Sequence, residues 1–151
     1  MGKAQCRILP DFMTKFYLIR HGDTDYSKTG SMIYTGIGKN FAPLTTEGCR
    51  QIRASVRDPR LADCELIISS PYTRALHSAA ILSKELQIDI EVEPTLYERV
   101  PDKNFERIGD SQSLRRIEEY NALNGVYPVG EEREWEDYSS LRNRLSNVFK
   151  K

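Results

Sequence analysis

The sequence has little cysteine and little histidine. Its three cysteines, Cys6, Cys49 and Cys64, are scattered and form no Cys-x-x-Cys pair. This pattern argues against a disulfide-stapled fold and a zinc ribbon, and it predicts reduced thiols in a cytoplasmic protein. The only two histidines, His21 and His77, are too few for a histidine-rich metal site, and the carboxylates show no spacing typical of metal ligands. We therefore expect a protein with no metal ion and no other cofactor.

The sequence also lacks net charge and long apolar runs. Its 22 lysines and arginines balance 22 aspartates and glutamates, so no overall field attracts nucleic acid or an acidic membrane. No apolar run approaches the ~18 residues of a membrane span, and residues 1–11 carry no apolar core of the signal-peptide kind. What remains is a chain of 151 residues with 39% apolar and 29% charged side chains. This composition predicts one soluble globular domain that binds neither nucleic acid nor membrane.

Short apolar runs alternate with amphipathic stretches along the chain. Residues 16–19 and 66–68 predict buried strands, and residues 88–92 predict a third strand. Helices are expected at 46–56, 71–86, 112–122 and 132–150. Strands and helices in alternation predict an α/β fold with a largely parallel sheet.

Local signals predict the ends and faces of these helices. Thr45 or Thr46 can cap the first helix, whereas Ser70 and Pro71 offer a cap and a first-turn proline for the second. One face of the last helix is apolar, formed by Trp135, Tyr138, Leu141, Leu145 and Val148. Residues 1–12 are expected to form an N-terminal extension or an ordered arm, and residues 13–151 the domain.

Chemically active residues directly follow the first predicted strand. They are Arg20, His21 and Gly22, and parallel sheets place their binding sites at the carboxyl ends of strands. A neutral imidazole is a nucleophile, and the guanidinium group of Arg20 fits the oxygens of a phosphate. Gly22 lets the backbone approach a bound anion closely. This segment therefore predicts a phosphate site.

Two further charged residues follow the other strands. Arg74 lies in the first turn of the second predicted helix, where free N–H groups already favour an anion. Glu98 follows the third strand and can protonate a leaving oxygen. With Arg20 and His21 they form a set of one nucleophile, two cationic groups and one acid. Such a set suits phosphoryl transfer and does not require a metal.

Five short blocks contain these residues and their neighbours. They are YLIRHGDT at 17–24, PLTTEG at 43–48, SSPYTRA at 69–75, LYER at 96–99 and GEE at 130–132. In this order they resemble the signature blocks of the histidine phosphatase superfamily, the phosphoglycerate-mutase-like enzymes. The resemblance covers about residues 15–148. It implies a three-layer α/β/α sandwich with a mostly parallel sheet.

The resemblance implies a role for each member of the set. In the family, the residue matched by His21 attacks phosphorus and becomes phosphohistidine. The arginines matched by Arg20 and Arg74 hold the phosphate, and the glutamate matched by Glu98 is the usual proton donor. Water then releases the phosphate, or in mutases a second oxygen of the substrate takes it.

The same resemblance implies further phosphate contacts and one missing part. Gly22 and Thr24 lie in the opening block, and Ser27 stands where the family commonly has an asparagine. The family's last block, whose second histidine completes the pocket, is not reached before Lys151. The chain thus resembles a C-terminally truncated member. We expect His77, in the second predicted helix, to pack or lie at the surface instead of replacing that histidine.

These features favour a metal-independent phosphomonoester hydrolase that acts through phosphohistidine at His21 on a phosphorylated small molecule. One alternative is a phosphotransferase of the phosphoglycerate mutase type. Another is a catalytically impaired form that only binds phosphate, because the second histidine is missing. Residues 25–42 and 101–130 are expected to select the substrate. The sequence identifies neither that substrate nor the oligomeric state.

Overall fold

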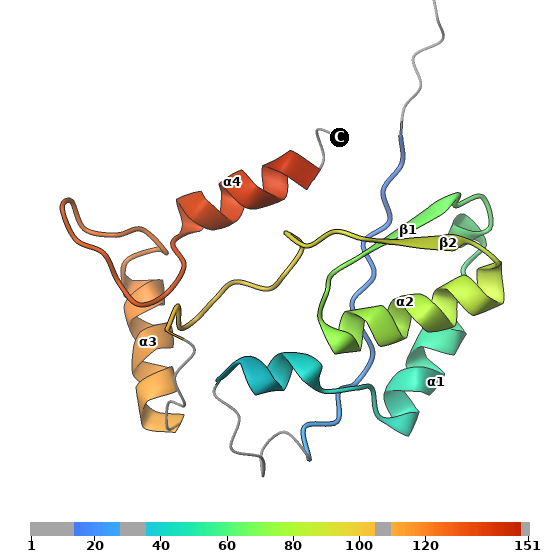
Figure 1. Ribbon diagram of the computed structural model, residues 1–151, viewed down its shortest axis with the longest axis horizontal. Coiled ribbons are helices and arrows are strands. Elements are labelled where there is room, and N and C mark those ends of the chain that lie inside the picture. Colours follow the sequence, from blue (N-terminus) through green and yellow to red (C-terminus); the bar gives the residue numbers. More distant parts are fainter. Residues whose placement is uncertain (1–13, 28–35, 105–109, 149–151) are drawn as a thin grey trace, which may run out of the picture.

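The computed structural model describes residues 14–27, 36–104 and 110–148 (Figure 1). The expected extension at 1–12 lies outside these residues. None of the described helices is long and apolar enough to cross a membrane. The elements, with η marking a 3-10 helix, are η1 (Gly36–Phe41), α1 (Thr46–Ser55), η2 (Pro59–Leu61), β1 (Leu66–Ser69), α2 (Thr73–Leu86), β2 (Asp89–Val92), α3 (Asp110–Ala122) and α4 (Tyr138–Val148).

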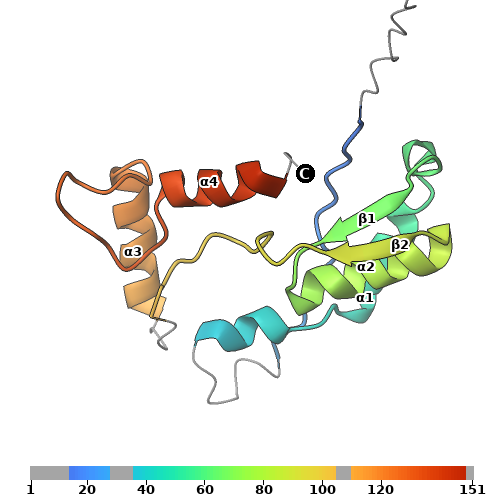
Figure 2. The ribbon, with the colours of Figure 1, turned by 45° about the horizontal axis from the view of Figure 1, so that its top comes forward.

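The two strands form a parallel sheet. Leu66 pairs with Asp89 and Ser69 pairs with Val92. Helix α2 connects the strands and packs against both of them (Figure 2). It ends at Gln87, which adopts the left-handed conformation with φ of 57°. A parallel pair joined by a helix confirms the predicted α/β fold.

The hydrophobic core lies between α1, α2 and the inner face of β1. The Oγ1 atom of Thr45 accepts the Gly48 N–H at 2.9 Å, which makes Thr45 the N-terminal cap of α1. This capped helix packs against α2. The buried apolar side chains between them are Leu44, Ile52, Ile81 and Leu82, with the partly buried Ile67 against them.

Residues 16–19 are not the buried strand that their composition predicts. They form no strand, and all four side chains are exposed. The exposed fraction of Leu18 is 90%. A strand needs a neighbour that completes its hydrogen bonds, and among the described residues the ladder consists of β1 and β2 alone. That prediction was therefore wrong, because apolar character does not create a pairing partner.

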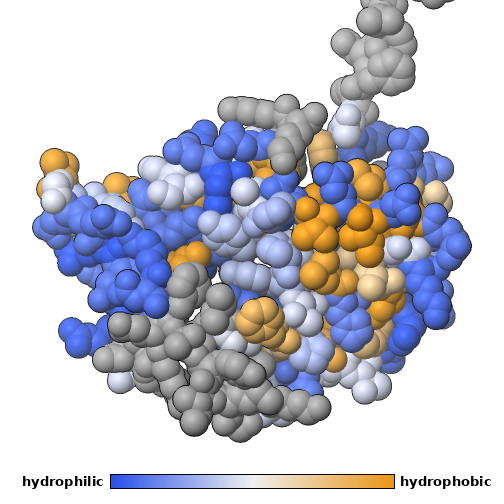
Figure 3. Space-filling model, in the orientation of Figure 1, coloured by the Kyte–Doolittle hydropathy of each residue, from blue (hydrophilic) through white to orange (hydrophobic). Residues whose placement is uncertain are grey.

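The outer face of the sheet is open. Strand β1 confirms the strand predicted at 66–68, but Leu66 and Ile68 are 46% and 42% exposed. They alternate with Ile67, which faces the core. Figure 3 shows apolar surface gathered over the part of the molecule that contains the two strands. The predicted burial of this strand was wrong, because among the described elements only α2 packs against it besides β2.

Helix α2 begins later than its sequence signals predict. Its first residue is Thr73, and Tyr72 at the N-cap makes no side-chain capping bond. The Ser70 Oγ instead accepts the Tyr72 N–H at 3.4 Å, which closes a short turn before the helix. Pro71 lies in that turn. The predicted cap and first-turn proline were therefore wrong.

Trp135 is the centre of packing in the C-terminal part. Its side chain is fully buried, and its Nε1–H donates to Glu119 on α3 at 3.1 Å. The ring centroids of Tyr120 and Tyr127 lie 5.1 and 4.8 Å from that of Trp135. Such edge-on and tilted aromatic contacts stabilise a cluster beyond the area they bury. This cluster attaches the segment before α4 to α3.

The last two helices only partly match the prediction. Helix α3 confirms the one expected at 112–122. Helix α4 covers only the later part of the one expected at 132–150, because residues 131–137 turn to place Trp135 against α3. The Asp137 Oδ1 accepts the Ser140 N–H at 2.8 Å, as a cap does. The predicted start was therefore wrong, because burial of one large ring prevailed over helical periodicity.

Candidate active site

Two glycines bring the His21 loop against the start of α1. A Cβ added to Gly22 would lie 2.4 Å from the Gly48 carbonyl oxygen, and one added to Gly48 would lie 2.1 Å from that of Asp23. Both distances are shorter than any carbon–oxygen contact a side chain can make. The two backbones therefore touch at a place where only glycine fits.

Hydrogen bonds complete this backbone contact. The Thr45 N–H donates to the Asp23 carbonyl oxygen at 2.9 Å, and the Asp25 N–H donates to that of Pro43 at 2.8 Å. The Asp23 N–H donates to the Gln51 Oε1 at 3.0 Å. Residues 22–25 are thus attached to α1 and to the segment before it. These contacts also fix the position of His21, which directly precedes Gly22.

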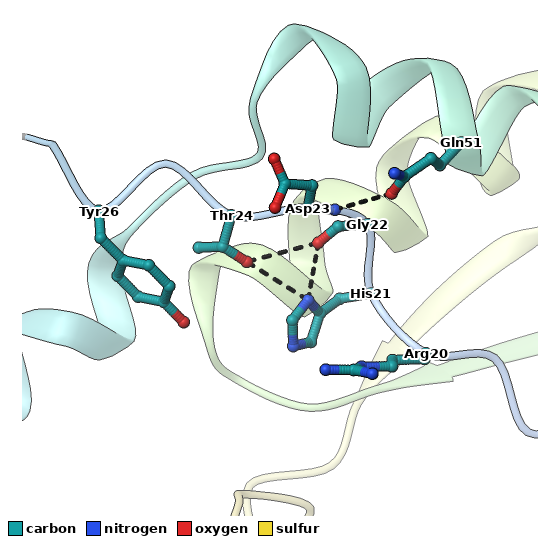
Figure 4. Close-up of a pocket in the computed structure, with 7 residues that line it drawn as sticks. All are labelled: Arg20, His21, Gly22, Asp23, Thr24, Tyr26 and Gln51. Carbon is teal, nitrogen blue, oxygen red and sulfur yellow. Dashed lines mark hydrogen bonds between the residues drawn. The ribbon is translucent and has the colours of Figure 1, made fainter.

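The imidazole of His21 has a defined orientation. Its Nδ1 lies 2.8 Å from the Gly22 carbonyl oxygen, which can only accept, so Nδ1 carries the proton. The Thr24 Oγ1 lies 3.4 Å from the same nitrogen. Figure 4 shows Nε2 on the opposite edge of the ring, facing the same open space as the Arg20 guanidinium. In the neutral imidazole Nε2 then carries the lone pair, which is available to a ligand.

An open pocket of about 380 Å³ lies in front of this imidazole. Four of the predicted site residues line it together: Arg20, His21, Gly22 and Thr24. The other lining residues are Asp23, Tyr26 and Gln51 (Figure 4). The sequence assigned no role to Asp23 and Gln51, whereas Tyr26 belongs to the 25–42 segment that is expected to select the substrate. The pocket thus brings one cationic side chain and one imidazole ring together.

Arg74 and Glu98 form a second group. The Arg74 Nη2 donates to the Glu98 Oε2 at 2.7 Å. The arginine side chain is only 6% exposed and the glutamate side chain 73%. The Tyr72 ring lies beneath the guanidinium, 4.7 Å from its central carbon, and burial raises the pKa of this tyrosine. Arg74 is thus a buried cation at the start of α2, with a carboxyl group reaching in from the surface.

Ser78 links the two groups. Its hydroxyl accepts the Gly22 N–H at 3.3 Å and donates to the Arg74 carbonyl oxygen at 2.8 Å. The side chain is buried. Ser78 was not predicted from the sequence, although its position one turn after Arg74 on the same helix was a usable signal. The His21 loop and the first turn of α2 are therefore joined by one hydroxyl.

Two remaining residues lie away from the pocket lining. Ser27 turns back on the loop, where its N–H and its hydroxyl both donate to the Asp25 Oδ1. His77 accepts the Leu44 N–H at 3.2 Å through Nδ1 and lies 3.7 Å from the Cys49 sulfur. His77 therefore packs within the helical layer, as expected. Among the described residues no three His, Cys, Asp or Glu side chains gather as metal ligands.

The fold is α/β, and its candidate site is a pocket lined by His21 and Arg20. A family model of the histidine phosphatase superfamily (branch 1) matches residues 16–151. The chain belongs to this superfamily. The match includes His21, Arg74 and Glu98, so these candidate residues lie within the region that the family model covers.

Similar proteins agree with this assignment. The chain is 30% identical over 86 residues to the probable phosphoglycerate mutase GpmB of Proteus mirabilis (strain HI4320), a match that covers 57% of this chain and 38% of that protein. A putative alpha-ribazole-5'-P phosphatase from Escherichia coli K-12 has the same fold with a TM-score of 0.59 and 21% identity, over 87% of this chain and 63% of its own. Mycobacterial glucosyl-3-phosphoglycerate phosphatase matches with a TM-score of 0.59 and 20% identity, over 86% and 59%. The chain therefore spans less than two thirds of the length of each.

Proposed function

We propose that this chain carries the phosphoryl-transfer site of a phosphomonoester hydrolase with His21 as the nucleophile. One observation carries the proposal: the Nδ1–H donates to the Gly22 carbonyl oxygen, which leaves the Nε2 lone pair facing the pocket beside Arg20. A ring nitrogen held in this way needs no further deprotonation before it attacks phosphorus. Membership of the histidine phosphatase superfamily supports this role.

The proposed reaction has two steps. In the first, Nε2 of His21 bonds to phosphorus while the ester P–O bond breaks, and the Glu98 carboxyl gives its proton to the leaving oxygen. In the second, water attacks phosphorus and the N–P bond breaks. The ring nitrogen then recovers its lone pair, phosphate departs, and the proton from water returns to Glu98.

The proposal assigns binding of the phosphate to positive charge and to N–H and hydroxyl groups. Arg20 lines the pocket and Arg74 is the buried cation at the start of α2, so both can neutralise the charge that develops on the phosphoryl oxygens. Gly22 and Thr24 bring backbone and hydroxyl groups to the same place. Ser27 joins them if its hydroxyl leaves Asp25 when phosphate binds. The proposed reaction therefore needs no metal ion. The proposed substrate is a phosphorylated small molecule, and the proposed location is the cytoplasm.

A second candidate function is transfer of phosphate between two oxygens of one substrate. The observation that favours it is the 30% identity to a protein named as a probable phosphoglycerate mutase. Both functions use the same phosphohistidine, and they differ in what accepts the phosphoryl group. Hydrolysis ranks first, because the pocket is open and gives water direct access to His21.

The test is hydrolysis of p-nitrophenyl phosphate with a metal chelator present. His21→Asn is the informative variant, because an asparagine amide can still donate to the Gly22 carbonyl but offers no nitrogen at the Nε2 position. His77→Asn is the matched control, since its amide oxygen can still accept the Leu44 N–H. We expect His21→Asn to lower kcat at least about 10³-fold and His77→Asn to leave kcat within a few-fold.

Three other results would change the assignment. Equal activity of the wild type and His21→Asn would contradict the proposal. Phosphate transfer from 2-phosphoglycerate to its 3-position without net release would favour the mutase. Binding of inorganic phosphate without turnover would assign the chain as a phosphate-binding form.

A further inference from the structure

The segment that carries Glu98 has no regular secondary structure to hold it. Residues 96–100 follow β2 and form neither helix nor strand. The Leu96 N–H donates to the Glu93 carbonyl oxygen in a local turn, but that bond does not fix the residues beyond it. The position of the Glu98 carboxyl therefore depends on side chains that reach this segment from elsewhere.

Arg144 on α4 reaches it with every donor that a guanidinium group has. Nη1 donates to the carbonyl oxygens of Thr95 and Tyr97, both at 2.8 Å, and Nη2 donates to that of Glu98 at 3.3 Å. Nε and Nη2 also donate to the two carboxylate oxygens of Glu136, at 2.7 and 2.8 Å. These five bonds match the five N–H groups of arginine. One planar group thus joins three backbone carbonyl oxygens within residues 95–98 to a carboxylate.

Glu136 completes this contact from the other side. Its Oε2 accepts the Val100 N–H at 3.1 Å, and its own N–H donates to the Val100 carbonyl oxygen at 2.8 Å. Its side chain is 9% exposed and that of Arg144 12%. Burial opposes ionisation of Glu136, but the hydrogen bonds from Arg144 and Val100 outweigh it and lower its pKa. The carboxylate therefore stays charged and holds the guanidinium in place.

The Tyr97 ring adds a stacking contact. It lies 3.7 Å from the central carbon of the Arg144 guanidinium, the geometry of a cation–π pair. The next residue, Glu98, then has its carbonyl oxygen bonded to Arg144 and its carboxylate bonded to Arg74. Two arginines from two different helices thus determine where this glutamate lies.

We infer that Arg144, backed by Glu136, is a positioning residue that holds the Glu98 backbone so that the Glu98 carboxyl reaches the reacting phosphate. The inference rests on the proposed function of Glu98 as the proton donor. Arg144 is not among the residues that line the pocket. It acts on the reaction only through the 95–100 segment.

This role has a consequence that a general loss of stability does not share. A proton donor matters most when the leaving oxygen is strongly basic. The p-nitrophenolate ion leaves without a proton, whereas the alkoxide of glycerol 2-phosphate does not. Displacement of Glu98 therefore slows the second substrate more than the first.

The experiment compares Arg144→Ala and Arg144→Lys with Arg142→Ala as the control. Arg142 lies on the same helix, two residues away, and is exposed. Lysine keeps the charge of Arg144 but cannot span three carbonyls and a carboxylate with one ammonium group. Glu98→Gln gives the benchmark for loss of the proton donor. Near-ultraviolet circular dichroism verifies that each variant is folded.

The first readout is hydrogen exchange of residues 95–100, which does not depend on activity. We expect Arg144→Ala to speed exchange of this segment at least about tenfold, with α1 and α2 unchanged. Arg144→Lys should have an intermediate effect and Arg142→Ala none. Unchanged exchange in both Arg144 variants would overturn the inference.

The second readout is kcat/KM for the two substrates, which reports transfer of the phosphoryl group to His21 and not the later hydrolysis that both substrates share. We expect Arg144→Ala to lower kcat/KM for glycerol 2-phosphate about 10- to 100-fold, as Glu98→Gln does, and for p-nitrophenyl phosphate less than about threefold. Equal losses on both substrates would overturn the positioning role. An inactive wild type would instead refute the proposed function, and the exchange of residues 95–100 would then decide by itself whether Arg144 holds this segment.

Discussion

The segment that carries His21 is held by backbone contacts, whereas the segment that carries Glu98 is held by side chains. At the first, Gly22 and Gly48 touch with no room for a Cβ. At the second, the guanidinium of Arg144 gathers three carbonyl oxygens and the carboxylate of Glu136. The proposed nucleophile and the proposed acid of one site are thus positioned by two different physical means.

The difference predicts how each segment responds to change. A close backbone contact cannot adapt, because an added methyl group must displace main-chain atoms of both partners. A guanidinium contact can be weakened in steps, since a lysine or a protonated partner removes only part of it. We therefore expect substitutions at the glycines to have larger effects than those at Arg144, and protonation of Glu136 to weaken the hold on the Glu98 segment.

The largest effect is expected for Gly48→Ala. Its Cβ would lie 2.1 Å from the Asp23 carbonyl oxygen and 2.8 Å from the Asp23 nitrogen, so the loop must move away. We expect a loss of about 3 kcal/mol or more in the free energy of unfolding, with loss of phosphatase activity. Urea unfolding followed by the fluorescence of Trp135, the single tryptophan of the chain, measures it.

Gly130→Ala is the control for this prediction. Gly130 has a φ of +80° but nothing within 4 Å of an added Cβ, so it tests conformational strain without steric overlap. We expect about 1 kcal/mol. Equal losses at the two glycines would mean that the contact between Gly22 and Gly48 is not what makes this part rigid.

The second effect is the coupling between Arg144 and Glu136. Arg144→Ala leaves a nearly buried carboxylate without its partner, so we expect it to cost about 2 kcal/mol of unfolding free energy. The double variant Arg144→Ala/Glu136→Gln should lose about 1 kcal/mol less unfolding free energy than the sum of the two single losses. A double-mutant cycle in urea measures this. The exposed pair Arg50–Glu47 on α1 is the control and should show no measurable coupling.

A smaller effect is expected for Trp135→Phe. The change removes the hydrogen bond to Glu119 and part of the ring volume between Tyr120 and Tyr127, which we expect to cost about 1.5 kcal/mol. Urea unfolding followed by circular dichroism measures it, since the fluorescence signal is lost. A loss of unfolding free energy as large as that of Gly48→Ala would contradict this order. It would mean that packing around Trp135 is as sensitive to substitution as the contact between Gly22 and Gly48.

The smallest effect is a dependence on pH that involves Glu136. Because the bonds from Arg144 and Val100 hold the folded-state pKa of Glu136 below its ordinary value of 4.5, the folded protein binds this proton less readily than the unfolded chain. The stabilisation is therefore present above about pH 4.5 and is lost as the pH falls through the folded-state pKa. The difference in urea midpoint between the wild type and Glu136→Gln should shrink from pH 7 to pH 3. A difference that stays constant with pH would mean that ionisation of Glu136 does not contribute to the stability of the folded protein.

Local sequence signals predicted the elements whose neighbours are near in the chain. Thr45 was one of two expected caps of α1, and the structure selects it. The parallel strands and α2 follow from apolar runs and helical periodicity within residues 66–92. Arg20, Gly22 and Thr24, which line the pocket with His21, were identified because they follow an apolar run directly and match a family block.

Other expectations failed where the deciding contact is distant. Residues 16–19 have strand composition, but a strand requires a paired neighbour that composition does not supply. Trp135 fits a helical stripe, but its ring packs against Tyr120 and Tyr127 and the helix begins after it. In both cases the sequence pattern describes a tendency of one segment, and the outcome depends on a second segment.

The sequence by itself determined which residues can do chemistry here, because imidazole, guanidinium and carboxyl groups keep their reactivity wherever the chain places them. It also determined the family and most helices, since these depend on residues a few positions apart. The tertiary structure alone decided that Nε2 of His21 faces the pocket, that Gly22 meets Gly48, and that Arg144 holds the Glu98 segment. The last two contacts join residues 26 and 46 positions apart, and the first depends on a loop held against α1. No local pattern encodes such contacts, because they form only when packing brings distant segments together.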